Sequence, residues 1–188
     1  LQVQDSASTD IKHSNVYVYA YLKQIPNVIL TAGVSADFLD GDSLELQNKS
    51  EVNPKFGVEW NPLPATTLRA AAFKVQKRTL VTDQTLEPTQ VAGFNQFFDD
   101  ANGTESWRYG VGLDQKFSRT FFGGAEFSKR DVKAPFISLG DDPENPVPTL
   151  TNEDVTEYLG RAYAFWTPHP WWACSAQYLY EKVESEGL

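Results

Sequence analysis

Side chains in this sequence alternate between apolar and polar over segments of about ten residues. The clearest example runs from Leu30 to Phe38, where Leu, Ala, Val, Ala and Phe are separated by Thr, Gly, Ser and Asp. Successive side chains of an extended strand point to opposite faces, so the pattern gives one apolar face and one polar face. The sequence therefore predicts β-strands that lie between two chemically different environments.

Eight segments of this kind are predicted along the chain. They cover residues 15–23, 28–40, 54–61, 66–78, 107–117, 120–131, 155–167 and 171–182. Short turns, several of them marked by Pro, join the segments in pairs, and longer polar stretches separate the pairs. In the fourth segment the apolar parity shifts at Phe73 and Val75, which we interpret as a β-bulge or as the strand leaving a membrane.

The placement of aromatic residues distinguishes two all-β folds. Aromatic residues cluster beside the short turns, at Trp60, Phe117, Phe121, Trp166, Trp171 and Trp172. Short turns at one end, long loops at the other and an aromatic girdle are typical of a transmembrane β-barrel of the outer-membrane type. A soluble sandwich or a lipocalin-like barrel shows the same alternation and is the alternative fold.

The polar face of the predicted strands carries many charged residues, which favours the membrane barrel. The residues expected to face the lumen include Glu59, Arg108, Asp114, Glu126 and Arg130. Unpaired charges in a closed soluble core cost several kcal/mol each, whereas a water-filled lumen tolerates them. We therefore predict an all-β fold, an antiparallel up-and-down transmembrane β-barrel in the outer membrane, with residues 1–188 forming part of one barrel domain.

The phase of the short turns indicates about eight strands of a larger barrel. In outer-membrane barrels the short turns are periplasmic and the long loops are extracellular. The first predicted strand would then begin, and the last would end, at the extracellular side. We expect both edges to pair with further strands of a parent barrel, because unpaired backbone groups are costly in lipid. The expected partners are these strands, outer-membrane lipid and a periplasmic protein.

Composition and spacing argue against several other classes of protein. The net charge of -9, from 16 basic and 25 acidic residues, would repel the phosphates of nucleic acid. The single Cys174 allows no internal disulfide, and His13 and His169 do not have metal-ligand spacing with it. We therefore predict that the chain is not an enzyme and that it has no catalytic residues, no metal site, no cofactor and no nucleic-acid partner.

The loop from Thr79 to Ser106 is the best candidate for ligand binding. Its candidate binding residues are Phe94, Phe97, Phe98, Asp99 and Asp100. Exposed aromatic residues often mark contact surfaces, but here we favour packing of the loop into the barrel mouth. The acidic pairs at 99–100 and 141–142 carry oxygen ligands suited to Ca²⁺, although solvated loop tips are the simpler interpretation.

Several stretches resemble outer-membrane receptors. Residues 53–62, NPKFGVEWNP, together with 66–71, TTLRAA, resemble a hairpin typical of TonB-dependent receptor barrels. Residues 85–100, TLEPTQVAGFNQFFDD, resemble a receptor-like group of outer-membrane proteins that carry tetratricopeptide repeats ahead of the barrel. Residues 107–114, WRYGVGLD, and 158–163, YLGRAY, fit the same group. The resemblance implies an internal fragment of a porin-like, Gram-negative receptor barrel.

Two functions are compatible with these observations. The first is a segment of a receptor or channel for transport across the outer membrane. The second is a structural barrel that anchors or assembles a surface or secretion complex, with no transport of its own.

Overall fold

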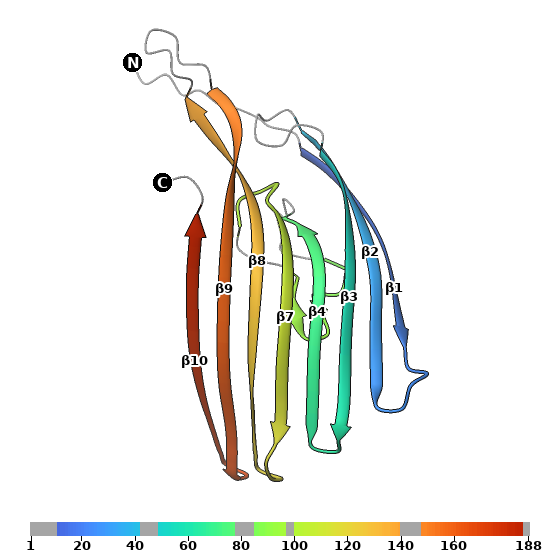
Figure 1. Ribbon diagram of the computed structural model, residues 1–188, viewed down its shortest axis with the longest axis vertical. Coiled ribbons are helices and arrows are strands. Elements are labelled where there is room, and N and C mark those ends of the chain that lie inside the picture. Colours follow the sequence, from blue (N-terminus) through green and yellow to red (C-terminus); the bar gives the residue numbers. More distant parts are fainter. Residues whose placement is uncertain (1–10, 42–48, 78–84, 97–99, 140–147, 186–188) are drawn as a thin grey trace.

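The computed structural model describes residues 11–41, 49–77, 85–96, 100–139 and 148–185. These residues form one eight-stranded sheet and a separate two-stranded hairpin (Figure 1). The sheet has the order β1-β2-β3-β4-β7-β8-β9-β10, and neighbouring strands are antiparallel. The predicted all-β, up-and-down architecture is confirmed.

The bounds of the strands are as follows. The sheet contains β1 (Ile11–Leu22), β2 (Val28–Gly41), β3 (Lys49–Leu63), β4 (Thr66–Gln76), β7 (Glu105–Lys116), β8 (Phe121–Leu139), β9 (Pro148–His169) and β10 (Trp172–Ser185). The separate hairpin contains β5 (Gln90–Val91) and β6 (Phe94–Asn95). Short turns join β1 to β2, β3 to β4, β7 to β8 and β9 to β10 at one end of the sheet, which we call the turn end; the opposite end is the loop end (Figure 1).

Several strands continue further toward the loop end than the sequence predicts. β3 begins at Lys49, before the predicted range 54–61, and β8 runs to Leu139, beyond the predicted range 120–131. β9 likewise begins at Pro148, before the predicted range 155–167, and its register with β8 holds as far as the pair Leu139 and Pro148. The extensions of β3 and β9 are mainly polar, and that of β8, VKAPFISL, is mostly apolar without strict alternation, so none of them shows the pattern that identifies a strand with one apolar face.

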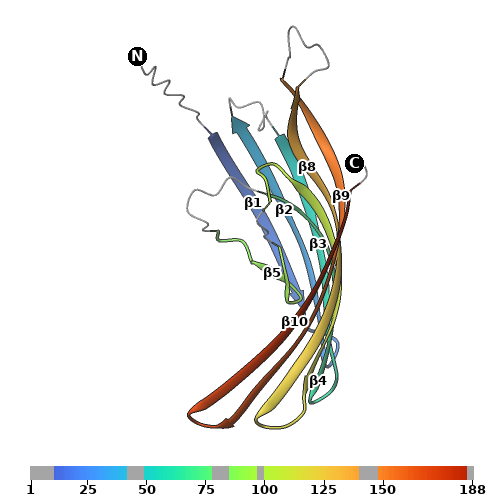
Figure 2. The same ribbon diagram turned by 90° about the vertical axis from the view of Figure 1, so that its left-hand side faces the viewer.

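The sheet is curved, and the β5–β6 hairpin lies on its concave side (Figure 2). Strands β1 and β10 form the two edges of the arc and do not pair with each other over the described residues. Within those residues, no helix has the length and apolar content needed to cross a membrane.

The sheet exposes apolar side chains and buries polar ones, which is the reverse of the arrangement in a soluble protein. Large apolar side chains on the convex face are exposed, among them Val16, Val18, Val52, Phe56, Val111, Phe127 and Tyr178. Polar side chains on the concave face are buried, among them Thr31, Ser35, Asn53 and Ser128. A soluble monomer rarely exposes such a large continuous apolar surface, whereas a lipid-facing barrel wall requires it.

Of the two causes predicted for the parity shift in β4, the structure contradicts the β-bulge. The register between β4 and β7 is continuous from Thr66 to Gln76, so the predicted β-bulge is wrong. Phe73 and Val75 point to the concave side and are buried there. Together with Ala71 they form a small core with Val91, Ala92 and Phe94 of the hairpin. The shift therefore marks the place where an apolar segment packs on the inner wall.

Candidate functional site

The inner wall of the arc and the hairpin that lies on it form the candidate site. We call residues 85–96, which contain β5 and β6, the wall hairpin. Its turn has positive φ angles at Ala92 and Gly93, both in the left-handed region. Two consecutive positive φ angles are typical of a type I′ turn, which suits a tight hairpin.

With φ of 45° at Ala92 and 82° at Gly93, the wall hairpin reverses direction within two residues. The backbone N–H of Gln96 donates to the carbonyl oxygen of Thr89 at 2.9 Å, which closes the hairpin beyond the paired residues of β5 and β6. The hairpin is therefore a compact element with its own hydrogen bonds, and it can present one side to the wall and the other to the lumen.

Two inward-facing glycines provide the space in which the wall hairpin packs. A Cβ atom on Gly57 would lie 2.9 Å from the Cβ atom of Ala92, and one on Gly110 would lie 2.6 Å from the ring of Phe94. Both distances are shorter than normal carbon contacts, so only glycine allows this approach. Phe94 also lies between two guanidinium groups, with its ring centre 5.1 Å from Cζ of Arg69 and 5.6 Å from Cζ of Arg108.

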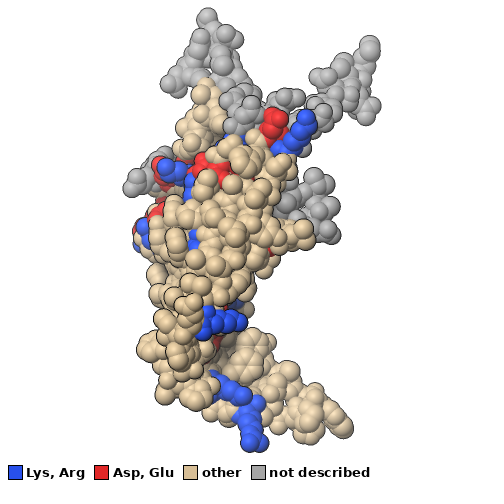
Figure 3. Space-filling view, turned by 90° about the vertical axis from the view of Figure 1, so that its right-hand side faces the viewer, with Lys and Arg blue, Asp and Glu red and all other residues tan. Residues whose placement is uncertain are grey.

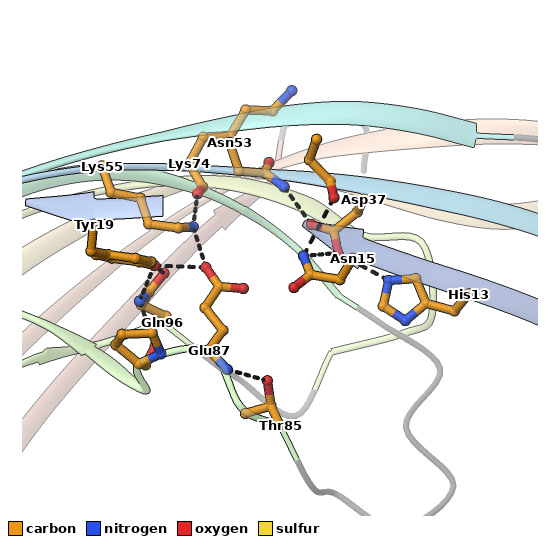
Figure 4. Close-up of polar contacts among 12 residues, drawn as sticks. His13, Asn15, Tyr19, Asp37, Asn53, Lys55, Lys74, Thr85, Glu87 and Gln96 are labelled. Atoms are coloured by element: carbon orange, nitrogen blue, oxygen red, sulfur yellow. Dashed lines mark hydrogen bonds and ion pairs between the residues drawn. The ribbon is translucent and has the colours of Figure 1, made fainter. Parts of the chain in front are cut away.

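A buried polar cluster connects the wall hairpin to β1 and β3 (Figure 4). Glu87 accepts a hydrogen bond of 2.6 Å from the hydroxyl of Tyr19 and forms an ion pair with Lys55. Lys55 also donates to the carbonyl oxygen of Lys74 at 3.1 Å, while the amide of Gln96 donates to Tyr19 at 2.9 Å. Paired in this way, the buried charges avoid the cost of an isolated charge in the protein interior.

A second buried cluster surrounds the carboxylate of Asp37, which is completely buried (Figure 4). The side-chain amides of Asn15 and Asn53 donate to it at 2.9 Å and 2.8 Å. Nε2 of His13 lies 2.9 Å from the same carboxylate. These contacts join β1, β2 and β3 side by side, so the cluster stiffens the first edge of the inner wall.

Along the rest of the wall, arginines of β4 and β9 flank carboxylates of the two strands between them, β7 and β8. Arg69 donates to Asp114 at 2.6 Å and lies 3.4 Å from Glu126. Arg161 approaches Glu126 from the other side, at 3.1 Å. Tyr163 donates a hydrogen bond to Asp114. Glu126 of β8 is therefore held between cations of β4 and β9, and Asp114 of β7 lies between the guanidinium of Arg69 and the hydroxyl of Tyr163.

The predicted lumen residues lie on this inner wall. Arg108 donates to the carbonyl oxygen of Asn95 at 3.1 Å and to the hydroxyl of Ser128 at 2.9 Å. Arg130 pairs with Glu157 at 2.6 Å. Glu59 is half-buried and is opposite Arg69 in the register of β3 and β4. Asp114 and Glu126 belong to the arginine–carboxylate series described above.

The predicted loop residues lie in several places. Phe94 is buried against the wall, and Asp100 forms an ion pair with Arg130 at 2.6 Å. Phe97, Phe98 and Asp99 lie outside the described residues, as does the acidic pair at 141–142. Among the described residues, no three His, Cys, Asp or Glu side chains come together in a way that could hold a metal ion.

Sequence reasoning did not identify the cluster that holds the wall hairpin. Glu87 lies in a long loop, and no local pattern connects it to Tyr19 or Lys55. The usable signal was the pair of glycines, Gly57 and Gly110, at inward positions of neighbouring strand pairs. Glycine in the interior of a strand often marks the close approach of another backbone.

Charged residues replace the apolar belt toward the loop end. Glu105 pairs with Lys49 at 2.5 Å and with Lys74 at 2.9 Å, beyond the exposed aromatic Tyr109. Although burial by itself raises the pKa of Glu105, hydrogen bonds from these two lysines lower that pKa to about 2. Figure 3 shows most of the acidic side chains on the visible face toward this end of the molecule, with basic side chains beside them and further basic side chains toward the turn end.

The apolar convex face, the polar inner wall and the up-and-down order together define an arc of an outer-membrane type β-barrel. No model of a protein family matches the sequence, and no curated protein matches it. Solved structures do show the same fold. The FrpB iron transporter from Neisseria meningitidis (F3-3 variant) is 14% identical, with a TM-score of 0.66 over 94% of this chain.

The alcaligin outer membrane receptor FauA from Bordetella pertussis is also 14% identical, with a TM-score of 0.66 over 94% of this chain. The alignments cover 26% of the FrpB chain and 31% of the FauA chain, so this chain spans less than a third of either. The similarity confirms the fold, a segment of an outer-membrane type β-barrel. It does not test the resemblance to the group with tetratricopeptide repeats.

Proposed function

We propose that this chain is a segment of an outer-membrane receptor or channel through which a solute crosses the membrane. The observation that carries the proposal is the inner wall, where charged and polar side chains of β3, β4, β7, β8 and β9 line a concave surface. Such a surface suits a water-filled passage, while the apolar convex face suits lipid. FrpB is an iron transporter and FauA an alcaligin receptor, and the shared fold agrees with a role in transport.

The partners proposed with this function follow from the same geometry. Lipid covers the convex face, and further strands of the parent barrel pair with β1 and β10, because open strand edges are costly in a bilayer. The turn end faces the periplasm in this arrangement, so a periplasmic partner would meet the barrel there.

Uptake by cells that lack the gene for the full-length protein tests the proposal. Such cells should lose uptake of at least one class of labelled solute, such as metal chelates, oligosaccharides or peptides. Expression of the full-length protein should restore that uptake. Normal uptake of every class, combined with loss of a surface or secretion complex, would favour the structural barrel instead.

A further inference from the structure

The wall hairpin covers cationic side chains of the inner wall. Lys55, Arg69 and Arg108 each contact one of its oxygen atoms: a carboxylate oxygen of Glu87, the carbonyl oxygen of Ala92 and the carbonyl oxygen of Asn95. The three cations come from β3, β4 and β7, which are neighbours in the sheet. Lys55 and Arg108 are almost completely buried, and Arg69 is largely so.

The side of the wall hairpin that faces away from the wall is uncharged. Its exposed side chains are Leu86, Thr89, Gln90 and Asn95. The amide of Gln90 donates to Asn95 at 3.0 Å, and Leu86 is 92% exposed. Glu87 carries the one negative charge among residues 85–96, and it is turned toward the wall. The hairpin therefore replaces a cationic wall with amides, a hydroxyl and one apolar side chain.

The contacts also fix the position of the wall hairpin. It is held to β1 by the hydroxyls of Tyr17 and Tyr19, which donate to Leu86 and Glu87 at 2.9 Å and 2.6 Å. It is held to β3, β4 and β7 by the small apolar core, by the ion pair of Glu87 with Lys55, and by its close packing on Gly57 and Gly110. A segment with buried contacts to four strands opens less readily than a loop that lies in solvent.

We infer that the wall hairpin is a fixed, uncharged constriction of the lumen, and that it favours uncharged hydrophilic solutes over ions. This inference rests on the proposed function, because a constriction has a role only where a solute passes. Thr89, Gln90 and Asn95 supply hydrogen-bond donors and acceptors to hydroxyl or amide groups of the solute. Leu86 supplies an apolar contact, and buried Lys55 and Arg108 attract no ions into the lumen.

Conductance of the full-length protein in planar bilayers tests the constriction. One variant replaces residues 85–96 with a Gly-Ser linker of the same length, which uncovers the cations and removes the charge of Glu87. We expect a higher conductance and, in a KCl gradient, a reversal potential shifted toward anion selectivity. Conductance and reversal potential equal to those of the native protein would overturn the inference.

A single charge on the hairpin provides a second test that preserves its packing. Thr89→Lys places a cation on the exposed side of the hairpin, and Ala101→Lys places one on an exposed position near the loop end. We expect Thr89→Lys to shift the reversal potential toward anions, with little shift for Ala101→Lys. Equal shifts in both variants, or none in either, would contradict a constriction at the hairpin.

The outcomes separate this inference from the proposed function. If the full-length protein restores solute uptake to cells that lack its gene, but the hairpin variants conduct like the native protein, the transport function stands and the constriction is wrong. If the gene makes no contribution to the uptake of any solute, the transport function fails, and the constriction fails with it.

Discussion

Nζ of Lys55 lies 3.4 Å from Oε1 of Glu87, and the two side chains are 1% and 0% exposed. Lys55 belongs to a strand of the wall and Glu87 to the hairpin that lies on it. Removing one member of a buried ion pair leaves the other charge without compensation, and this is more costly than losing the attraction between them. The pair therefore makes the position of the hairpin depend on the wall residue beneath it.

Lys55→Met should loosen the wall hairpin. The substitution leaves Glu87 buried without its cation, at a cost of roughly 3–5 kcal/mol, and release of the hairpin into water relieves that cost. Hydrogen exchange at the backbone N–H of Gln96 should become faster. Lys133→Met, at an exposed position of β8, is the control and should leave this exchange rate unchanged.

Gly110→Ala should destabilise the barrel by roughly 1–3 kcal/mol, because its Cβ would overlap the ring of Phe94. Gly160→Ala is a matched control, since a Cβ there would lie 3.6 Å from its nearest neighbour, an ordinary contact. Thermal unfolding of both variants of the full-length protein in lipid vesicles provides the measurement. Equal stability of the two would be inconsistent with tight packing of Phe94 on the wall.

Val111→Arg should destabilise the folded protein in lipid by roughly 2–4 kcal/mol, because Val111 is 59% exposed on the apolar convex face. Gln177→Arg, at an exposed position of the inner face of β10, should have little effect. Folding yields in vesicles measure the difference. Similar yields for both variants would contradict the assignment of the convex face to lipid.

Thiol labelling should distinguish the two faces of β10. In a Cys174→Ser background, a membrane-impermeant reagent should modify Gln177→Cys faster than Ala176→Cys, because water reaches the lumen side and lipid covers the other. Ser35 and Arg108 share the inner face but are buried, so cysteines there should react slowly. Faster labelling at Ala176→Cys would contradict the assignment of the convex face to lipid and the concave face to the lumen.

The stabilising contribution of Glu105 should disappear in acid. Its pKa in the folded protein is about 2, below the ordinary value of 4.5, so the folded state favours the charged form. The contribution is present above pH 4.5 and is lost as the pH falls toward 2. The difference in the free energy of unfolding between the native protein and Glu105→Gln should shrink over that range. A constant difference would show that Lys49 and Lys74 do not stabilise this carboxylate.

The sequence by itself determined the strands and the two faces of the sheet. Alternation is a local property, because the geometry of an extended backbone sends successive side chains to opposite sides. It therefore assigned Val34 and Val111 to one face and Arg108 and Glu126 to the other. The loop ends of β3, β8 and β9 were not predicted, since the mainly polar ends of β3 and β9 and the mostly apolar end of β8 carry no regular alternation.

The tertiary structure decided what covers the inner face. Tyr19 and Glu87 are 68 residues apart in the chain, and they meet because the sheet places β1 beside the position where the wall hairpin folds back. The parity of Phe73 appeared in the sequence as an irregularity, and only the hairpin explains it. Local patterns set the direction of each side chain, but a partner distant in the sequence is fixed only when strand pairing brings the two segments together.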